Sequence, residues 1–398
     1  MIVSSGIRSL VSRPVFVAAF RPFYLLGSLF GVSILLLSSG YLSGQIILES
    51  QRLSFGLWHG HELIHGFAGA IVLGFILTAL PSWAGARELR GGKLILLVML
   101  WLAGRLAFWL EAWLPLELIA VADSSVFIVA SLLIFEDLRK AKKRFFLVVL
   151  PIFAGFYLGN ILFYVALQGM DYSLASLALK ISLFAIIFKF ATVGGYLSVV
   201  FSNNVLAARG LPLIEFSKLM DICALSSIVL MFTALIIPFS PVVTLLCSLF
   251  AFVSHLLRLA SMRFWQIAHE PLLLAMNLAY GWMVVSFLLK AFYEAGWLAE
   301  DIWLHAFTIG AMGTIMLSLM TRVTLRHTGR PLRLSGAGKV ILGLAAISAS
   351  FRVFSEIEEM LLLLGAGVIF SLALLLYLGI YGRMLLLPCQ PKDRPSGG

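Results

Sequence analysis

Long uninterrupted apolar runs dominate this sequence and restrict its fold more than any other feature. Hydrophobic residues make up 61% of the 398-residue chain and charged residues only 12%, whereas a soluble domain is about half apolar and about a quarter charged. A helix that crosses a bilayer needs about 20 mostly apolar residues. We therefore expect an all-α, polytopic membrane bundle, surrounded by lipid, that forms a single domain over residues 1–398.

Charged and turn-rich breaks divide the apolar runs into twelve predicted spans. Their expected bounds are 24–48, 61–83, 94–114, 118–135, 146–168, 174–200, 219–238, 241–257, 272–292, 302–325, 339–355 and 359–387. The shortest connections lie at Pro115 and between Pro238 and Pro241. No linker is long enough to separate soluble domains, and no internal repeat is recognisable in the sequence.

The distribution of lysine and arginine orients these spans. Cytoplasmic loops of membrane proteins carry an excess of both residues, and here they gather in alternate loops, most densely over 322–339. The opposite loops are acidic or neutral, with Arg52 and Arg352 as exceptions. We therefore predict that both termini are cytoplasmic, with tails at 1–22 and 388–398. The net charge of +10 follows from this bias and does not indicate a nucleic-acid partner.

Three of the seven histidines stand at the start of the second predicted span, in WHGHELIHGF at 58–67. The alternation of spans places His59, His61 and His65 at the outer end of the bundle, together with His305 at the start of span ten. His61 and His65 are four residues apart and share one helix face, whereas His59 points elsewhere. Ionisable residues within membrane spans are candidates for function.

Two imidazoles that face each other from neighbouring helices in apolar surroundings suit axial ligation of haem iron, and imidazole also suits copper. We therefore predict haem or a metal between spans two and ten, and His61 and His305 are our first choice as ligands. His65 is able to replace His61 in this scheme, and His59 is expected to bind copper or to support a ligand. The other three histidines fall at the inner end: His255, His269 and His327.

Several charged residues lie within the predicted spans. Arg105 in span three and Arg322 near the inner end of span ten are candidates for binding haem propionates or other anions. Asp123 is expected nearer the outer end than Arg105. Lys180 is close enough to a span end to snorkel towards water, whereas Lys189 lies deeper and is a functional candidate.

Four stretches resemble the NnrS family. They are FRPFYLLGSLFG at 20–31, WHGHELIHGFAGAIVLGFILTALPSWAG at 58–85, LWLAGRLA at 100–107 and LHAFTIGAMGTIMLSLMTRVTLRHTGRPL at 304–332. Members of that family are twelve-span proteins of the bacterial inner membrane that contain haem and copper and are associated with nitric-oxide metabolism and relief of nitrosative stress. The resemblance implies the same location and cofactors, and a small ligand such as nitric oxide or a nitrosyl species.

The resemblance also bears on single residues. Four histidines match recurrent positions of the family and are candidate metal ligands: His59, His61, His305 and His327. Asn277 stands where a histidine is usual, and Tyr196 where an arginine is usual. His65 is an addition at a position that is usually apolar. If the missing histidine binds a metal in other members, this chain holds fewer metals than they do.

Two classes of function stay open at the level of the sequence. The first is an NnrS-like haem and copper protein that reacts with nitric oxide, senses it or assists another enzyme, with its catalytic residues and electron donor unassigned. The alternative is a multi-span transporter of a small solute or metal without bound haem. Both share the twelve spans and the buried charges, so a visible spectrum is needed to separate them.

Overall fold

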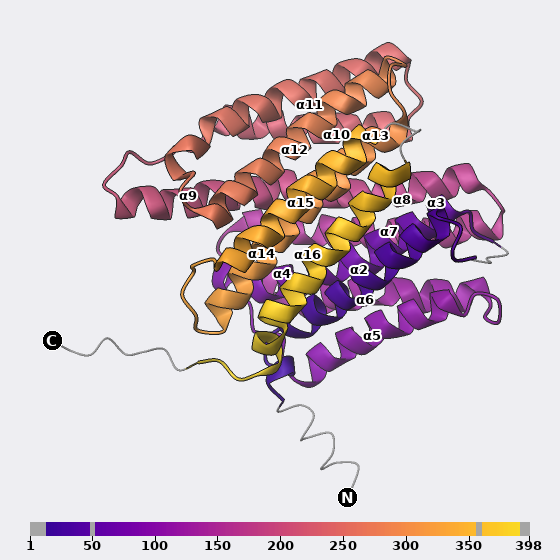
Figure 1. Cartoon of the computed structure of the whole chain (residues 1–398), viewed down its shortest axis with the longest axis horizontal. Helices are drawn as coiled ribbons and strands as arrows, with labels where there is room; N and C mark the ends of the chain where they lie inside the picture. Colours follow the sequence, from indigo (N-terminus) through magenta and orange to yellow (C-terminus); the bar gives the residue numbers. More distant parts are fainter. Residues whose placement is uncertain (1–12, 48–51, 356–359, 391–398) are drawn as a thin grey trace, which may run out of the picture.

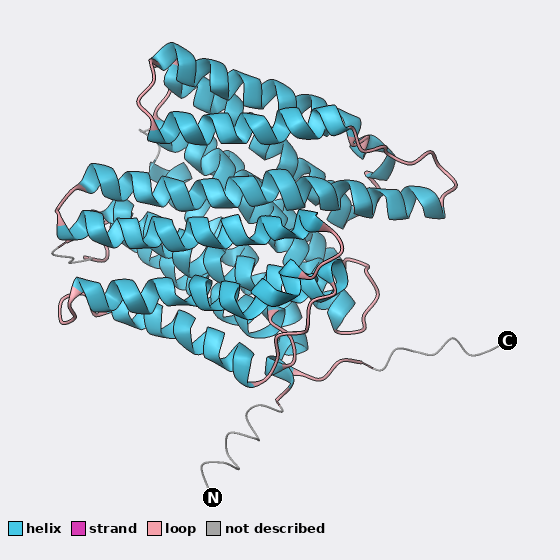
Figure 2. Cartoon of the chain, turned by 180° about the vertical axis from the view of Figure 1, so that it is seen from behind, coloured by secondary structure: helices cyan, strands magenta, loops and turns pink. Residues whose placement is uncertain are grey.

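The computed structural model describes residues 13–47, 52–355 and 360–390, so more than half of each predicted tail, 1–22 and 388–398, lies outside the described residues. Within the described residues the regular structure is helical and contains no strand (Figure 2). Twelve helices of this part are long and apolar enough to cross a membrane. The predicted all-α bundle of about twelve spans is confirmed, and the protein is a multi-pass membrane protein.

The spans follow one another as a bundle of helices that lie side by side (Figure 1). Nine are single helices: α2 (Phe20–Leu42), α5 (Gly92–Trp109), α6 (Leu116–Arg139), α7 (Val149–Gln168, preceded by the short 3-10 helix η3, Arg144–Val148), α10 (Lys218–Ile236), α11 (Pro241–Ser261), α12 (Pro271–Glu294), α15 (Gly336–Phe354) and α16 (Met360–Leu386). Three consist of two α-helices joined by a π-helical segment: α3 (Phe55–His61), η2 (Glu62–Ala68) and α4 (Gly69–Ala84) in span two; α8 (Tyr172–Lys189), η4 (Phe190–Gly194) and α9 (Gly195–Ala208) in span six; α13 (Glu300–His305), η6 (Ala306–Gly313) and α14 (Thr314–His327) in span ten.

Local sequence signals set several span ends. Ser54 and Asp171 cap the starts of spans two and six, where their side-chain oxygens accept the backbone N–H groups of the third residue that follows, a common way to satisfy a helix N-terminus. Pro115 precedes α6, and Pro241 is the first residue of α11. Since proline supplies no backbone N–H, it fits the start of a helix, and the breaks predicted at both places are present.

The first and last spans pack against each other and close the bundle. Arg21, near the start of α2, is completely buried. Its guanidinium donates to the backbone carbonyl of Leu385 in the last turn of α16 at 3.0 Å and to that of Leu387, just beyond this helix, at 2.6 Å. The start of the first span therefore lies beside the end of the last, as an even number of spans requires. That this side is cytoplasmic stays a prediction.

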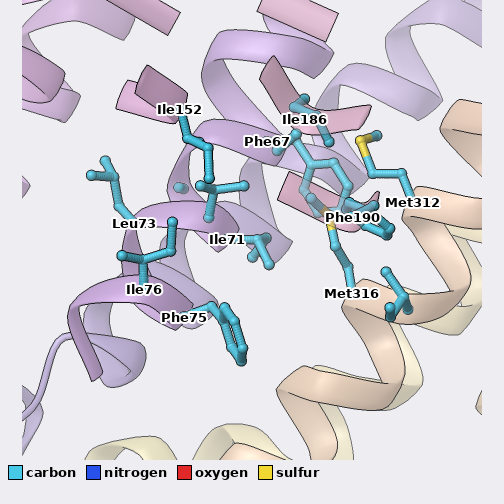
Figure 3. Packing of buried hydrophobic residues seen from close by; sticks show 14 of the residues in the cluster. Phe67, Ile71, Leu73, Phe75, Ile76, Ile152, Ile186, Phe190, Met312 and Met316 are labelled. Carbon is cyan, nitrogen blue, oxygen red and sulfur yellow. The ribbon is translucent and has the colours of Figure 1, made fainter. Parts of the chain in front are cut away.

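Spans two, six and ten form the interior of the bundle. Among the described spans they are the most deeply buried, and each contains one of the three π-helical segments. Their side chains meet in the buried core of the bundle, where Phe67 of span two, Phe190 of span six and Met312 and Met316 of span ten lie together (Figure 3). Because π-helical segments often mark functional sites, their recurrence in spans two, six and ten makes these three spans candidates for carrying the functional site.

Candidate functional site

A cavity of about 620 Å³ lies among spans one, two, six, ten, eleven and twelve. It occupies the end of the bundle at which spans two, six and ten begin, and its lining includes Phe67 and Met312 of the contact shown in Figure 3. Its wall is mainly apolar and includes Leu63, Phe67, Leu183, Met312 and Phe370. Pockets that hold cofactors and similar ligands have volumes of about 300–1,000 Å³ and mostly apolar walls, so the cavity is large enough for a cofactor.

Two histidines from different spans, His59 and His305, line this cavity. The Nδ1 atom of His59 lies 2.8 Å from Ser38 Oγ, and that hydroxyl donates its own hydrogen to the Ile34 carbonyl, so Oγ accepts from His59. The Nδ1 atom of His305 lies 2.7 Å from the backbone carbonyl oxygen of Asp301, which can only accept. Both rings therefore carry a proton on Nδ1, and neither Nε2 lone pair has a hydrogen-bond partner among the described residues. In this form histidine binds metals.

Two cations, Lys180 and Arg352, also line the cavity. The Nζ atom of Lys180 lies 2.6 Å from Glu300 Oε1, and Nη2 of Arg352 lies 2.7 Å from Asp301 Oδ2. Glu300 and Asp301 are consecutive residues at the start of α13, so the two cations, which come from spans six and eleven, are both held at the end of the cavity where span ten begins. The backbone of Asp301 thus orients His305 while its carboxylate holds Arg352.

His61 lies in a second polar group of residues and does not line the cavity. Its Nδ1 atom is 3.2 Å from Glu62 Oε1, and its Nε2 atom is 2.9 Å from Asn160 Oδ1. The rings of Phe108 and Phe163 stack on its two sides at 4.2 and 4.6 Å. Both ring nitrogens are thus hydrogen-bonded, and the aromatic rings leave no space for a macrocycle. The structure brings His305 together with His59 rather than with His61.

Arg105 belongs to the same polar group as His61. Its guanidinium is buried and donates to the carboxylates of Glu62 and Asp123. Asp123 also accepts from the Tyr164 hydroxyl at 2.7 Å. The expectation that Arg105 and Asp123 lie at different depths is wrong, because the two residues are in direct contact. Gly104 allows spans three and four to approach closely at this level: a Cβ atom at Gly104 would lie 2.7 Å from Asp123 Cα. Since two carboxylates hold this guanidinium, Arg105 does not reach the cavity.

His65 and Asn277 are buried away from the cavity. The His65 ring lies 4.9 Å from that of His61, and neither of its nitrogens has a hydrogen-bond partner among the described residues. Asn277, at the position where a histidine is usual in the resembling family, donates to the backbone carbonyl of Leu273 at 2.9 Å. Neither residue is placed to bind a ligand in this cavity.

Arg322 and His327 lie towards the opposite end of span ten. The 22 residues from His305 to His327 correspond to about 33 Å of helix at 1.5 Å per residue, so these two histidines cannot share one ligand. Arg322 stacks over the Phe201 ring at 4.0 Å. Among the described residues, no group of three His, Cys, Asp or Glu side chains is arranged to hold a metal ion. The copper site therefore stays a prediction.

Four residues at the cavity have roles that the sequence interpretation did not assign: Ser38, Lys180, Asp301 and Arg352. For Arg352 a signal existed, because it and Arg52 are the two cations that the sequence places among otherwise acidic or neutral loops. Ser38 gave no signal, since a serine in a membrane helix usually bonds its own backbone. Its second contact depends on how spans one and two pack.

This chain matches one protein-family model over most of its length. A family model described as NnrS protein matches residues 14–388. The match includes every residue that lines the cavity and all members of the polar group around Arg105. No curated protein matches the chain.

Proposed function

Because the chain belongs to the NnrS family, we propose that it is a haem protein of the bacterial inner membrane that acts in nitric-oxide metabolism or in the relief of nitrosative stress. Membership of this family fits a membrane protein that is associated with nitric oxide and nitrosative stress. One observation supports the haem assignment above all others: His59 and His305 line one mainly apolar cavity, and within the described part of the chain each has an Nε2 lone pair without a hydrogen-bond partner.

The residues of the cavity fit a b-type haem. The apolar wall suits the macrocycle, and imidazoles from spans two and ten are suitable axial ligands. Lys180 and Arg352 supply positive charge at the end where span ten begins. In this proposal His59 replaces His61 as the partner of His305.

Bound haem would supply a redox-active iron that can exchange electrons and bind nitric oxide. The protein contributes the arrangement of its own residues. Ser38 and the Asp301 carbonyl hold the two histidine protons on Nδ1 and fix the orientation of the rings. The apolar wall, with Phe67 and Phe370 among its members, keeps water away from the site.

A visible spectrum tests this proposal. We expect the full chain, purified from a haem-competent host, to show a Soret band that shifts on reduction with dithionite and shifts again when nitric oxide is added. A correctly folded protein without a Soret band would contradict the haem assignment and favour the transporter alternative. A Soret band that does not respond to nitric oxide would keep the haem and contradict the role in nitric-oxide chemistry.

A further inference from the structure

The cations of the cavity lie together, although they come from distant parts of the chain. Lys180 belongs to span six and Arg352 to span eleven, and each is paired with one of two consecutive carboxylates at the start of α13. Glu300 and Asp301 stand in the first turn of α13. The pairing therefore places both cations at the end of the cavity where span ten begins, in a wall that is otherwise mainly apolar.

This distribution describes the ligand that the cavity would accept. A large apolar body would fill the space between the spans, and two anionic groups on one edge of that body would meet Lys180 and Arg352. Haem has this chemistry, because its two propionates leave the macrocycle on the same edge. Arginine binds carboxylates through two parallel hydrogen bonds, and lysine acts as a point charge.

We propose that Lys180 and Arg352 form a receptor for the two carboxylates of the bound ligand, and that Glu300 and Asp301 hold these cations in place before the ligand arrives. This inference rests on the proposed haem function. The residues expected from the sequence to bind propionates do not compete for this role. Arg105 is engaged by two buried carboxylates, and Arg322 lies towards the other end of span ten.

The exposed fractions of the four charged side chains support a change of partner, in which Lys180 and Arg352 leave Glu300 and Asp301 for the carboxylates of the ligand. Lys180 and Arg352 are 19% and 12% exposed, whereas Glu300 and Asp301 are 33% and 50% exposed. The two acids therefore keep contact with water when the cations turn to a ligand carboxylate, so the exchange leaves no buried charge unpaired. Ion pairs between partly exposed groups are weak enough to be replaced.

Binding of haem and of its dimethyl ester, which lacks both carboxylates, tests the receptor. Apoprotein from haem-deficient cells, in lipid nanodiscs, is titrated with each compound and followed by tryptophan fluorescence and Soret absorbance. The readout is the ratio of the two dissociation constants within one protein, which a general loss of stability does not change. The variants are Lys180→Met, Arg352→Met and the double variant. The control is Lys290→Met, since Lys290 pairs with Glu294 of its own helix and does not line the cavity.

We expect the unmodified protein to prefer haem over the diester by about a hundredfold, since each charge-assisted contact contributes about tenfold. Each single variant should retain about a tenfold preference, the double variant almost none, and Lys290→Met the full preference. Equal binding of both compounds by the unmodified protein, or an unchanged preference in the double variant, would overturn the receptor. If neither compound binds the unmodified protein, the proposed haem function itself fails.

Discussion

Replacement of His305 or His59 by alanine is expected to remove most of the haem from the purified protein. Both residues line the cavity and present a free Nε2 lone pair. Removal of a group that only orients a ligand lowers metal affinity by about 10–100-fold, so loss of either ligand should lower haem affinity by about a hundredfold or more. The measurement is the ratio of haem to protein, determined as the pyridine haemochrome in each variant.

Two variants distinguish this arrangement from the one that the sequence suggests. His61→Ala should keep its haem, because His61 lies outside the cavity and both of its nitrogens are engaged elsewhere. Ser38→Ala should weaken haem binding by about tenfold, since it removes only the group that orients His59. Loss of haem in His61→Ala together with full retention in His59→Ala would contradict the assignment. Loss confined to the His255 or His327 variants would place the site at the other end.

Replacement of Arg105 by methionine is expected to destabilise the fold by about 3–5 kcal/mol, because it leaves the buried carboxylates of Glu62 and Asp123 without their cation. The measurement is the free energy of unfolding in mixed micelles titrated with SDS. If charge is the cause, neutralising both acids in the same chain, as Glu62→Gln and Asp123→Asn, should restore most of the loss.

The pair formed by Arg139 and Glu136 supplies the matched control. Both side chains are more than half exposed, and the pair joins residues of one helix. Exposed pairs of this kind contribute at most about 1 kcal/mol, so Arg139→Met should change the unfolding free energy little. If Arg105→Met unfolds at the same SDS fraction as Arg139→Met, the ion pairs of Arg105 do not hold spans two, three and four together.

The membrane fold could be predicted from the sequence because the bilayer imposes two strong patterns. Apolar runs of at least span length show where helices cross, and Pro115 and Pro241 mark breaks within otherwise continuous apolar sequence. The three π-helical segments could not be predicted. They occur in apolar sequence of the same kind as the neighbouring α-helices, for example at Phe190–Gly194, and depend on how the interior helices pack.

The sequence predicts His61 as the ligand from span two, whereas the residue of this span that lines the cavity together with His305 is His59. Two residues along an α-helix turn the side chain by about 200°, so His59 and His61 point to opposite sides. Which side faces span ten depends on the rotation of span two within the bundle. The apolar sequence around it does not reveal this rotation, because this span is buried nearly all round.

The pairing of the buried charged residues could not be predicted from the sequence either. Arg105 and Asp123 were both recognised as buried charges, and the sequence offered no way to pair them. Gly104 decides that pairing by allowing close helix approach, and glycines of this kind are frequent in membrane helices. Arg352 had stood out only as an exception to the charge rule. In the structure this exception is a cation at the cavity.

The position of the iron tests the central claim most directly. Crystals of the haem-loaded protein, measured at the iron absorption edge, give an anomalous difference map that locates the metal independently of the surrounding atoms. We expect one iron peak in the cavity, within bonding distance of the Nε2 atoms of His59 and His305. A peak beside His61 and His65, or at the opposite end of the bundle beside His255 or His327, would contradict it.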